Sequence, residues 1–146
     1  MNTIGRAEKI DIPVLALAQM PAKIDTGAFS SSIDCSEARV VERDSRQILE
    51  FIVLRPGREG YTGDWQSTEQ FDVTEVRNSN GTEQRYVIFI EIALGGKRHS
   101  CRLTLANRHH LRYPVLIGRQ FLREAQYIVD VSQGNGLAGD EEERLL

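Results

Sequence analysis

The strongest constraint on this 146-residue chain is an alternation of side chains between residues 85 and 94, which read RYVIFIEIAL. Every even-numbered position of this stretch is apolar, and most of the odd-numbered positions are apolar too. Successive side chains of a strand point to opposite faces, so both faces of this strand need to be buried. Gly95-Gly96 then predicts a tight turn, and residues 98–106 predict the returning strand. The pattern therefore indicates a central β-hairpin in a β-rich protein.

The rest of the chain adds more strands and little helix. Further strands are predicted at residues 12–18, 48–54, 70–76, 113–117 and 127–131. One short helix is expected from Gly118 to Ala125, and a second helix is expected to start near Ser36. A small closed barrel buries both faces of such strands. We therefore predict an all-β fold, a small closed barrel over residues 1–132 with one short C-terminal helix, followed by a flexible acidic tail over residues 133–146.

Bulk properties exclude some classes of partner. The net charge of −3 argues against nucleic acid, whose binding proteins carry a basic excess on one face. No apolar stretch approaches the roughly 18 residues that a membrane span needs. Charged residues crowd the start of the short apolar run at residues 12–20, so we interpret it as a strand rather than a leader and expect a cytoplasmic protein. Cys35 and Cys101 are too few for a disulfide scaffold and are expected to be thiols.

Two motifs carry the candidate chemistry. The first is AKIDTGA at residues 22–28, where an apolar step leads into Asp25, and the second is VLIGRQFL at residues 115–122. By itself the first motif also fits an ordinary turn or helix cap. Together, in this order and in a β-rich chain of this size, the two motifs resemble those of the retropepsins, the dimeric aspartic proteases.

The resemblance extends to a narrower group. With SNGTEQR, LANRHHLRYPVLIGRQFL and a late VDV, the chain is similar from about residue 11 to residue 131 to the bacterial ATP-dependent zinc protease family. That family is retropepsin-like, and some of its members are linked with glutamate-ligating ATP-grasp enzymes. The resemblance implies an acid-protease fold, a homodimer and a peptide substrate.

Peptide hydrolysis by water needs a base that activates the water and an acid that protonates the carbonyl oxygen. Two carboxylates that share one proton supply both roles, because like charges a few ångströms apart do not both ionise easily. Only one D-T-G is present, so a two-fold homodimer has to bring Asp25 together with its own copy. Asp25 is the predicted catalytic residue. Thr26, Gly27 and Ala28 are predicted to shape its loop, with Thr26 bonding across the axis and Gly27 permitting close backbone approach.

Arg119 is the predicted supporting residue, because the resemblance implies that the short Gly-Arg helix packs beneath the catalytic loop. Retropepsins carry an acid just after D-T-G-A that pairs with this arginine, and here Phe29 stands in its place. Arg119 is therefore expected to bond to backbone carbonyls, to Asp34 or to another acid. The alternative is an ordinary solvated helix arginine. Asp34 is also an alternative second acid for an intrachain dyad with Asp25.

The substrate side of the site is predicted from a loop and two arginines. The polar loop at residues 55–67 is the nearest counterpart, by order, of the retropepsin flap, with Tyr61 or Trp65 as residues that cover the site. Arg85 and Arg108 are candidates to receive an acidic substrate, with ordinary surface charge as the alternative. The family's link with glutamate ligases suggests glutamate-rich peptide tails as substrates.

Neither metal nor nucleotide is indicated by the residues themselves. The histidines at 99, 109 and 110 lack the spacing of H-E-x-x-H, and there is no C-x-x-C and no phosphate-binding G-x-x-x-x-G-K-[ST] loop. A three-ligand zinc site from His99, Cys101 and Cys35 is the remaining metal alternative. We expect no cofactor and no metal.

The sequence thus predicts an aspartic peptidase with a dyad formed across a homodimer. The alternative is a non-catalytic peptide- or partner-binding module, accessory to a glutamate-ligating ATP-grasp enzyme. A zinc hydrolase is a third hypothesis. The aspartic mechanism differs from the others in requiring Asp25 for turnover.

Overall fold

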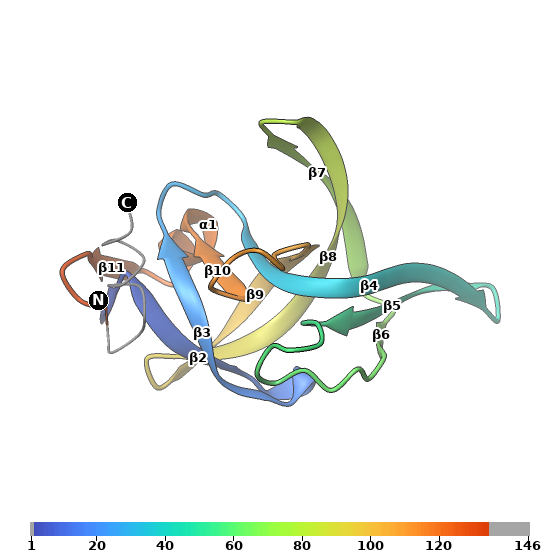
Figure 1. The fold of residues 1–146 in the computed structure, drawn as a ribbon, viewed down its shortest axis with the longest axis horizontal. Helices are drawn as coiled ribbons and strands as arrows, with labels where there is room; N and C mark the ends of the chain where they lie inside the picture. Colours follow the sequence, from blue (N-terminus) through green and yellow to red (C-terminus); the bar gives the residue numbers. More distant parts are fainter. Residues whose placement is uncertain (1, 135–146) are drawn as a thin grey trace.

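The computed structural model of the chain describes residues 2–134, and strands dominate them (Figure 1). The strands are β1 (Asn2–Gly5), β2 (Ala7–Ile12), β3 (Leu17–Asp25), β4 (Ser31–Arg43), β5 (Arg46–Val53), β6 (Gln66–Thr68), β7 (Phe71–Asn78), β8 (Gly81–Leu94), β9 (Lys97–Ala106), β10 (Val115–Gly118) and β11 (Tyr127–Asp130). The helical elements are the 3₁₀ turn η1 (Pro13–Leu15) and the helix α1 (Arg119–Glu124).

Six strands close into a ring in the order β10-β3-β2-β8-β9-β4, and β4 pairs back with β10. The ring encloses a single cluster of apolar side chains. Several of these side chains are fully buried, including Ile12, Ile33, Ile92, Leu103 and Ile117. The all-β fold with a closed ring of strands and one short helix confirms the predicted fold class.

The predicted central hairpin is present as β8 and β9. These strands pair antiparallel from Val87 opposite Thr104 to Leu94 opposite Lys97. The strand β8 also pairs with β2 and β7, so it lies in the interior of the sheet. The side chains of Val87 and Ile92 are 0% exposed, as expected for a strand that is covered on both faces.

Two hairpins extend away from the ring (Figure 1). The β4–β5 hairpin runs out to one side, beyond the part of β4 that pairs with β9 and β10. The outer part of the β7–β8 hairpin rises away from the ring toward the top of this view. The loop between β5 and β6 crosses the side of the molecule near β2 and η1. The molecule therefore presents one ring and two arms.

The predicted strand at residues 12–18 is wrong, because a reversal occupies its middle. Pro13 has no N–H to donate to a sheet, and Ala16 adopts a left-handed conformation with φ of 55°. The chain turns through η1, and β2 pairs antiparallel with β3 on either side of the turn. Within the turn only Leu15 is buried, whereas Pro13, Val14 and Ala16 are exposed, so the apolar run does not mark one buried strand.

The predicted helix near Ser36 is also wrong. The strand β4 continues through this position to Arg43 and pairs along this length with β5. The Ser36 hydroxyl donates a hydrogen bond to the carbonyl of Ile52, in the neighbouring strand, at 3.4 Å. Pairing between strands overrides the local capping signal of the serine.

The two ends of the described chain lie together. The strands β1 and β11 pair in parallel, and the N–H of Arg6 donates to the carbonyl of Gln133 at 2.8 Å. The predicted domain boundary after residue 132 stays a prediction. Except for its first two residues, the predicted acidic tail over residues 133–146 lies outside the described residues. Within residues 2–134, no helix combines the length and apolar character that crossing a membrane requires.

Candidate active site

The D-T-G loop, defined here as residues 25–30, begins where β3 ends. The strand β10 pairs in parallel with β3, and Gly118 lies opposite Asp25. The N–H of Gly27 donates to Asp25 Oδ1 at 2.9 Å, and the other carboxylate oxygen receives no hydrogen bond from the described residues. Asp25 is half-buried, whereas Thr26 and Gly27 are exposed. The loop is thus a tight turn that holds a carboxylate at the surface with one oxygen available.

Helix α1 supports this loop from below through three hydrogen bonds. The Arg119 guanidinium donates to the carbonyl of Gly27 at 3.0 Å. The backbone N–H groups of Arg119 and Gln120 donate to the carbonyls of Ala28 and Phe29 at 2.7 and 3.1 Å. The Arg119 guanidinium also lies over the Phe29 ring, 5.5 Å from its centroid. Of the partners that the sequence left open, Arg119 therefore uses a backbone carbonyl, and Phe29 adds a ring contact.

Gly118 allows the helix to approach so closely. A Cβ atom at this position would lie 2.5 Å from the carbonyl oxygen of Ser30 and 2.7 Å from that of Phe29. Backbone atoms cannot move away as a flexible side chain can, so only glycine fits. The N–H of Gly118 donates to the Ser31 hydroxyl at 3.0 Å, which ties β10 to the start of β4.

A cavity of about 470 Å³ opens beside the D-T-G loop. Its wall consists of residues 27–30 of the loop, residues 75–77 of β7, and side chains of the ring. The structure brings the predicted residues Arg85 and Arg108 to this wall, together with Arg77, which the sequence did not single out. Glu75 is the one acid among the described lining residues. We call this space the basic cavity.

Arg108 is the most buried cation of the basic cavity, with only 8% of its surface exposed. Its Nε donates to the carbonyl of Tyr113 at 3.1 Å, and no acid among the described residues forms an ion pair with its guanidinium. Burial, together with the charges of Arg58 and Arg85, lowers the pKa of Arg108, although Asp34 and Asp25 oppose the shift. A buried guanidinium without an acidic partner is stabilised by a nearby negative charge. Arg108 therefore favours the binding of an anion in the cavity.

A buried ionic cluster around Asp34 holds Arg108 in place. Asp34 is 0% exposed, and its two oxygens accept hydrogen bonds from Arg55 at 2.8 and 2.6 Å. Arg58 adds a third bond at 3.1 Å, and the backbone N–H of Arg108 a fourth at 2.8 Å. Burial alone would raise the pKa of Asp34, but the hydrogen bonds from the Arg55 side chain and the Arg108 backbone, together with the charges of Arg55 and Arg58, hold the pKa below its usual range. The Asp34 carboxylate is thus occupied by hydrogen bonds from Arg55, Arg58 and the Arg108 backbone. The structure therefore does not support the alternative in which Asp34 and Asp25 of one chain form the dyad.

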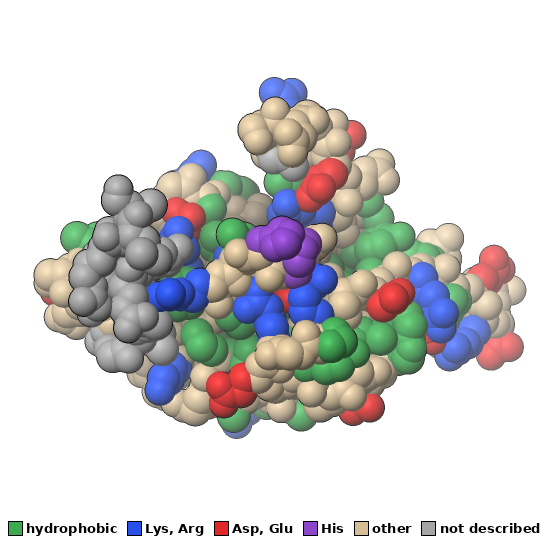
Figure 2. Space-filling view, viewed as in Figure 1, with side chains coloured by type: hydrophobic (Ala, Val, Ile, Leu, Met, Phe, Trp, Pro, Cys, Tyr) green, Lys and Arg blue, Asp and Glu red, His purple; other side chains and the backbone are tan. Residues whose placement is uncertain are grey.

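The sequence did not reveal this cluster because its members come from distant segments without a shared motif. The Arg58 guanidinium also donates hydrogen bonds to the carbonyls of Arg108, Leu111 and Arg112. Arg58 thereby connects the loop after β5 to the loop after β9. Figure 2 shows Lys and Arg side chains gathered with the histidines across the middle of this face. The only signal of the ionic cluster in the sequence is the number of basic residues in these two loops.

The loop at residues 55–67 does not line the basic cavity. Tyr61 packs against the hydrophobic core, and the Trp65 ring lies beneath the guanidinium of Arg39 at 4.2 Å. The β7–β8 hairpin provides the wall that faces the D-T-G loop instead. A substrate-binding role for Tyr61 and Trp65 stays a prediction, and their positions do not support it.

The histidines and cysteines do not gather into a metal site. His99 Nε2 lies 2.8 Å from the Tyr127 hydroxyl, and His109 Nδ1 lies 2.6 Å from the Asn107 side-chain oxygen. Cys35 donates its thiol to the carbonyl of Glu37. Within residues 2–134 there is no group of three His, Cys, Asp or Glu residues that could hold a metal ion. The zinc alternative therefore has no support in this part of the chain.

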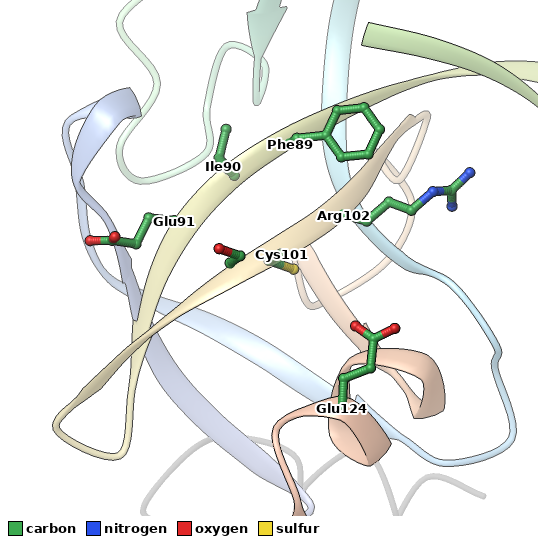
Figure 3. A pocket seen from close by; sticks show the side chains of 7 residues that line it. Phe89, Ile90, Glu91, Cys101, Arg102 and Glu124 are labelled. Atoms are coloured by element: carbon green, nitrogen blue, oxygen red, sulfur yellow. The ribbon is translucent and has the colours of Figure 1, made fainter. Parts of the chain in front are cut away.

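A second cavity, of about 400 Å³, lies between the β8–β9 hairpin and α1 (Figure 3). The Cys101 sulfur and the Glu124 carboxylate face the same space, while Glu91 and Arg102 point in opposite directions. Burial, and to a smaller extent the charge of Glu124, raises the pKa of the Cys101 thiol to about 12. A thiol that stays protonated is a poor nucleophile, so these surroundings do not activate Cys101. Cys35 and Cys101 are both free thiols.

A closed ring of strands, with an Asp-Thr-Gly loop at the end of one strand and a Gly-Arg helix bracing that loop, defines a retropepsin-like acid-protease fold. The family model described as RimB-like, "Retropepsin-like aspartic endopeptidase RimB", matches residues 3–135. The chain therefore belongs to the RimB-like family of retropepsin-like aspartic endopeptidases, which confirms the resemblance drawn from the two motifs.

Curated relatives are larger proteins. Two that are named probable alpha-L-glutamate ligase, from Shewanella pealeana and Parasynechococcus marenigrum, are each 30% identical to this chain, over 141 and 138 residues. The matches cover 89% and 94% of this chain but only 28% and 29% of those ligases. The chain thus spans less than a third of the length of these relatives.

A solved structure shares the fold over nearly its whole length. It is a protein of unknown function from Legionella pneumophila, 26% identical, with a TM-score of 0.70. The match covers 90% of this chain and 95% of that protein.

Proposed function

We propose that this protein is an aspartic peptidase in which Asp25 of two protomers forms the catalytic dyad. The observation that carries the proposal is the D-T-G loop, which is braced by Arg119 and holds a carboxylate with one oxygen unbonded among the described residues. Thr26, Gly27 and Phe29 are exposed beside it, so the surface around Asp25 is available for a two-fold contact. An isologous contact there pairs each Asp25 with its copy.

In the proposed dimer the two carboxylates share one proton. One acts as the base that takes a proton from the attacking water, and the other is the acid that protonates the carbonyl oxygen of the scissile peptide. The hydrogen bond from the Gly27 N–H to Asp25 Oδ1 fixes the carboxylate plane. Arg119 holds the loop through the Gly27 carbonyl without reaching the reacting atoms, so it acts as a positioning residue.

We propose acidic, glutamate-rich peptide segments as the substrate class. Arg77, Arg85 and Arg108 line the basic cavity next to the loop, and carboxylates bind guanidinium groups through charge-assisted hydrogen bonds. The naming of the curated relatives as glutamate ligases is compatible with a glutamate-rich substrate or with a ligase partner. A cytoplasmic location stays a prediction, with which the two free thiols agree.

The test is cleavage of a peptide that carries a run of glutamates, with Asp25→Asn as the variant and Asp64→Asn, an exposed acid outside the lining of the basic cavity, as the matched control. We expect Asp25→Asn to lower the rate by about 10²- to 10⁴-fold or more, since it removes the acid–base pair, while dimerisation persists. The control variant should keep the rate. Equal rates for the wild type and Asp25→Asn would contradict the aspartic mechanism, and equal cleavage of a glutamine-substituted peptide would contradict the substrate class.

A non-catalytic module is the second candidate, and the match to about 28% of each ligase favours it. Such a module holds a peptide or a ligase partner in the same basic cavity without cutting it. It predicts no turnover in the wild type, with binding of acidic peptides that Arg108→Ala abolishes and Asp25→Asn leaves unchanged. The cleavage assay above, combined with a binding titration, distinguishes the two candidates.

A further inference from the structure

We propose that the outer segment of β4, residues 37–43, pairs antiparallel with the same segment of a second copy of this chain, with Val40 on the two-fold axis. The segment forms one strand of the β4–β5 hairpin, which runs out beside the ring (Figure 1). It contributes none of the described residues that line the basic cavity. The contact is therefore a surface for self-association that is separate from the D-T-G loop and independent of the proposed dyad.

One edge of the outer segment has no strand beside it among residues 2–134. The other edge pairs with β5 along the whole segment. The strand β9 pairs with β4 only over residues 31–34, and β10 pairs with it only at residues 32 and 33. The free edge therefore presents backbone N–H and C=O groups to which another extended strand can add.

The hairpin around this segment has little cover of its own. Residues 37–40 and 42–47 are exposed, and β6 adds a third strand only over residues 49–51 of β5. A two-stranded ribbon is marginally stable in water, and further strands stabilise it. Antiparallel pairing with a second copy joins the two hairpins into one continuous sheet, which supplies this cover.

The length of the segment determines the register of the pairing. The regular ladder between β4 and β5 starts at Glu37, after a bulge, and ends at Arg43, so its midpoint is Val40. With the axis at this midpoint, Glu37 lies opposite Arg43 of the second copy, and the two-fold symmetry makes this pair twice. Val40 lies opposite its own copy. Opposite charges and apolar side chains that face each other in this way stabilise a sheet.

Neighbouring registers place like charges directly opposite each other. With the axis one residue later, Arg39 lies opposite Arg43 of the second copy. With the axis one residue earlier, Arg39 lies opposite its own copy. Like charges in directly opposite positions destabilise a pair of strands. The charges of the segment therefore favour the register that its length predicts, in which Arg39 lies opposite the apolar Val41.

The ion pairs already present in the hairpin leave a positive charge on this face. Glu50 accepts hydrogen bonds from Arg39 at 2.9 Å and from Arg43 at 2.8 Å, so one carboxylate serves two guanidinium groups. The Glu37 carboxylate forms no ion pair within residues 2–134. In the proposed contact, Glu37 of the second copy supplies the acid that balances the second guanidinium.

A contact of one short strand from each copy is small, so we expect it to be weak by itself. Its effect depends on whether the D-T-G loops also pair. A chain with two isologous surfaces joins its dimers into larger assemblies, whereas a chain with the β4 surface alone stops at a dimer.

The experiment introduces Val40→Cys into the full chain, oxidises the protein with copper phenanthroline, and measures disulfide-linked dimer on a non-reducing gel. Opposite residues of antiparallel strands have Cα atoms about 4.5–5.5 Å apart, which suits a disulfide. The wild type gives the background from the native cysteines. Val14→Cys, at an exposed valine of η1, controls for random collision. Glu42→Cys controls for register, because the pairing places it about 13 Å along the strand from its own copy.

We expect Val40→Cys to give about ten-fold more linked dimer than either control. Glu37→Arg, added to Val40→Cys, places arginines opposite each other and should lower the yield about five-fold or more. Glu42→Arg changes the net charge equally but lies opposite Ala38 of the second copy. This matched control should lower the yield by less than about two-fold.

A Val40→Cys protein that links no better than the two cysteine controls would overturn the proposal. Equal yields with Glu37→Arg and Glu42→Arg would overturn it too. The readout does not depend on turnover. A protein that cross-links as expected but cleaves no peptide would contradict the proposed peptidase and leave this contact in place. Cleavage that depends on Asp25, without the cross-link, would contradict the β4 contact alone.

Discussion

Two aspartates of this chain have opposite surroundings, and this difference separates their roles. Asp34 is fully buried and its oxygens accept hydrogen bonds from Arg55, Arg58 and the backbone of Arg108. Asp25 is half-buried at the end of a strand and accepts one hydrogen bond from its own loop. A saturated buried carboxylate stabilises structure, whereas a partly free one near the surface is available to substrate and to a second carboxylate.

The Asp34→Asn variant tests the structural role. Removing one partner of a buried ion pair leaves the guanidinium groups uncompensated, so we expect the free energy of unfolding to fall by about 3–5 kcal/mol. Asp64→Asn, at an exposed position, should change it by less than about 0.5 kcal/mol. Denaturant titrations at neutral pH measure both. An Asp34→Asn protein as stable as the wild type would show that the cluster contributes nothing to folding.

The same residue makes stability depend on pH. The folded-state pKa of Asp34 lies below the unfolded value, so its contribution is present above the unfolded pKa and is lost as the pH falls through the folded pKa. The wild type should therefore lose stability below about pH 4, and Asp34→Asn should lose less over that range. Asp130 and Glu50 also have lowered pKa values, so a residual acid dependence is expected in the variant. Identical slopes for both proteins would contradict this assignment.

At the scale of elements, the contact between α1 and the D-T-G loop links the fold to the site. Three hydrogen bonds join the first turn of α1 to the carbonyls of the loop, and Gly118 permits the close approach. The helix is only six residues long, so its role here is to position the loop rather than to add to the core.

Replacing Arg119 by methionine should weaken the contact between α1 and the D-T-G loop. The variant keeps most of the side-chain volume but loses the bond to the Gly27 carbonyl, so we expect the rate of peptide cleavage to fall by about 10- to 100-fold. Stability should change by less than about 1 kcal/mol, since the guanidinium bond is exposed. Arg123→Met, in the same helix and exposed, is the matched control and should alter neither quantity. Parallel losses of rate and melting temperature would indicate a merely structural role for Arg119.

Elements with strong local patterns were predictable from the sequence, and elements that depend on distant partners were not. The alternation at residues 85–94 predicted β8, and the Gly-Arg motif predicted α1. The long strand β4 carries mixed polar residues and was missed, because its pairing with β5, β9 and β10 determines it. The two sequence motifs identified Asp25 and Arg119 as site residues. Asp34, Arg55 and Arg58 carry no motif, and only the closed ring brings them together.

At the scale of the whole molecule, closure of the six-stranded ring leaves one face with the D-T-G loop, the basic cavity and the β7–β8 hairpin. Each chain carries one D-T-G sequence, so a dyad needs two chains. The strands β1 and β11 pair with each other within the chain. Because the proposed dyad joins Asp25 to its copy, the proposed dimer contact is expected to include the D-T-G loops, where Phe29 is 48% exposed.

The most direct measurement of the central claim mixes wild-type chains with Asp25→Asn chains in equal amounts, allows the subunits to exchange, and records the rate of peptide cleavage. If each subunit contributes one carboxylate, only dimers of two wild-type chains are active, and random exchange leaves about a quarter of the activity of an all-wild-type sample at the same total concentration. If each chain works alone, about half of the activity remains. A quarter supports the shared dyad, and a half, or no cleavage by the wild type, contradicts it.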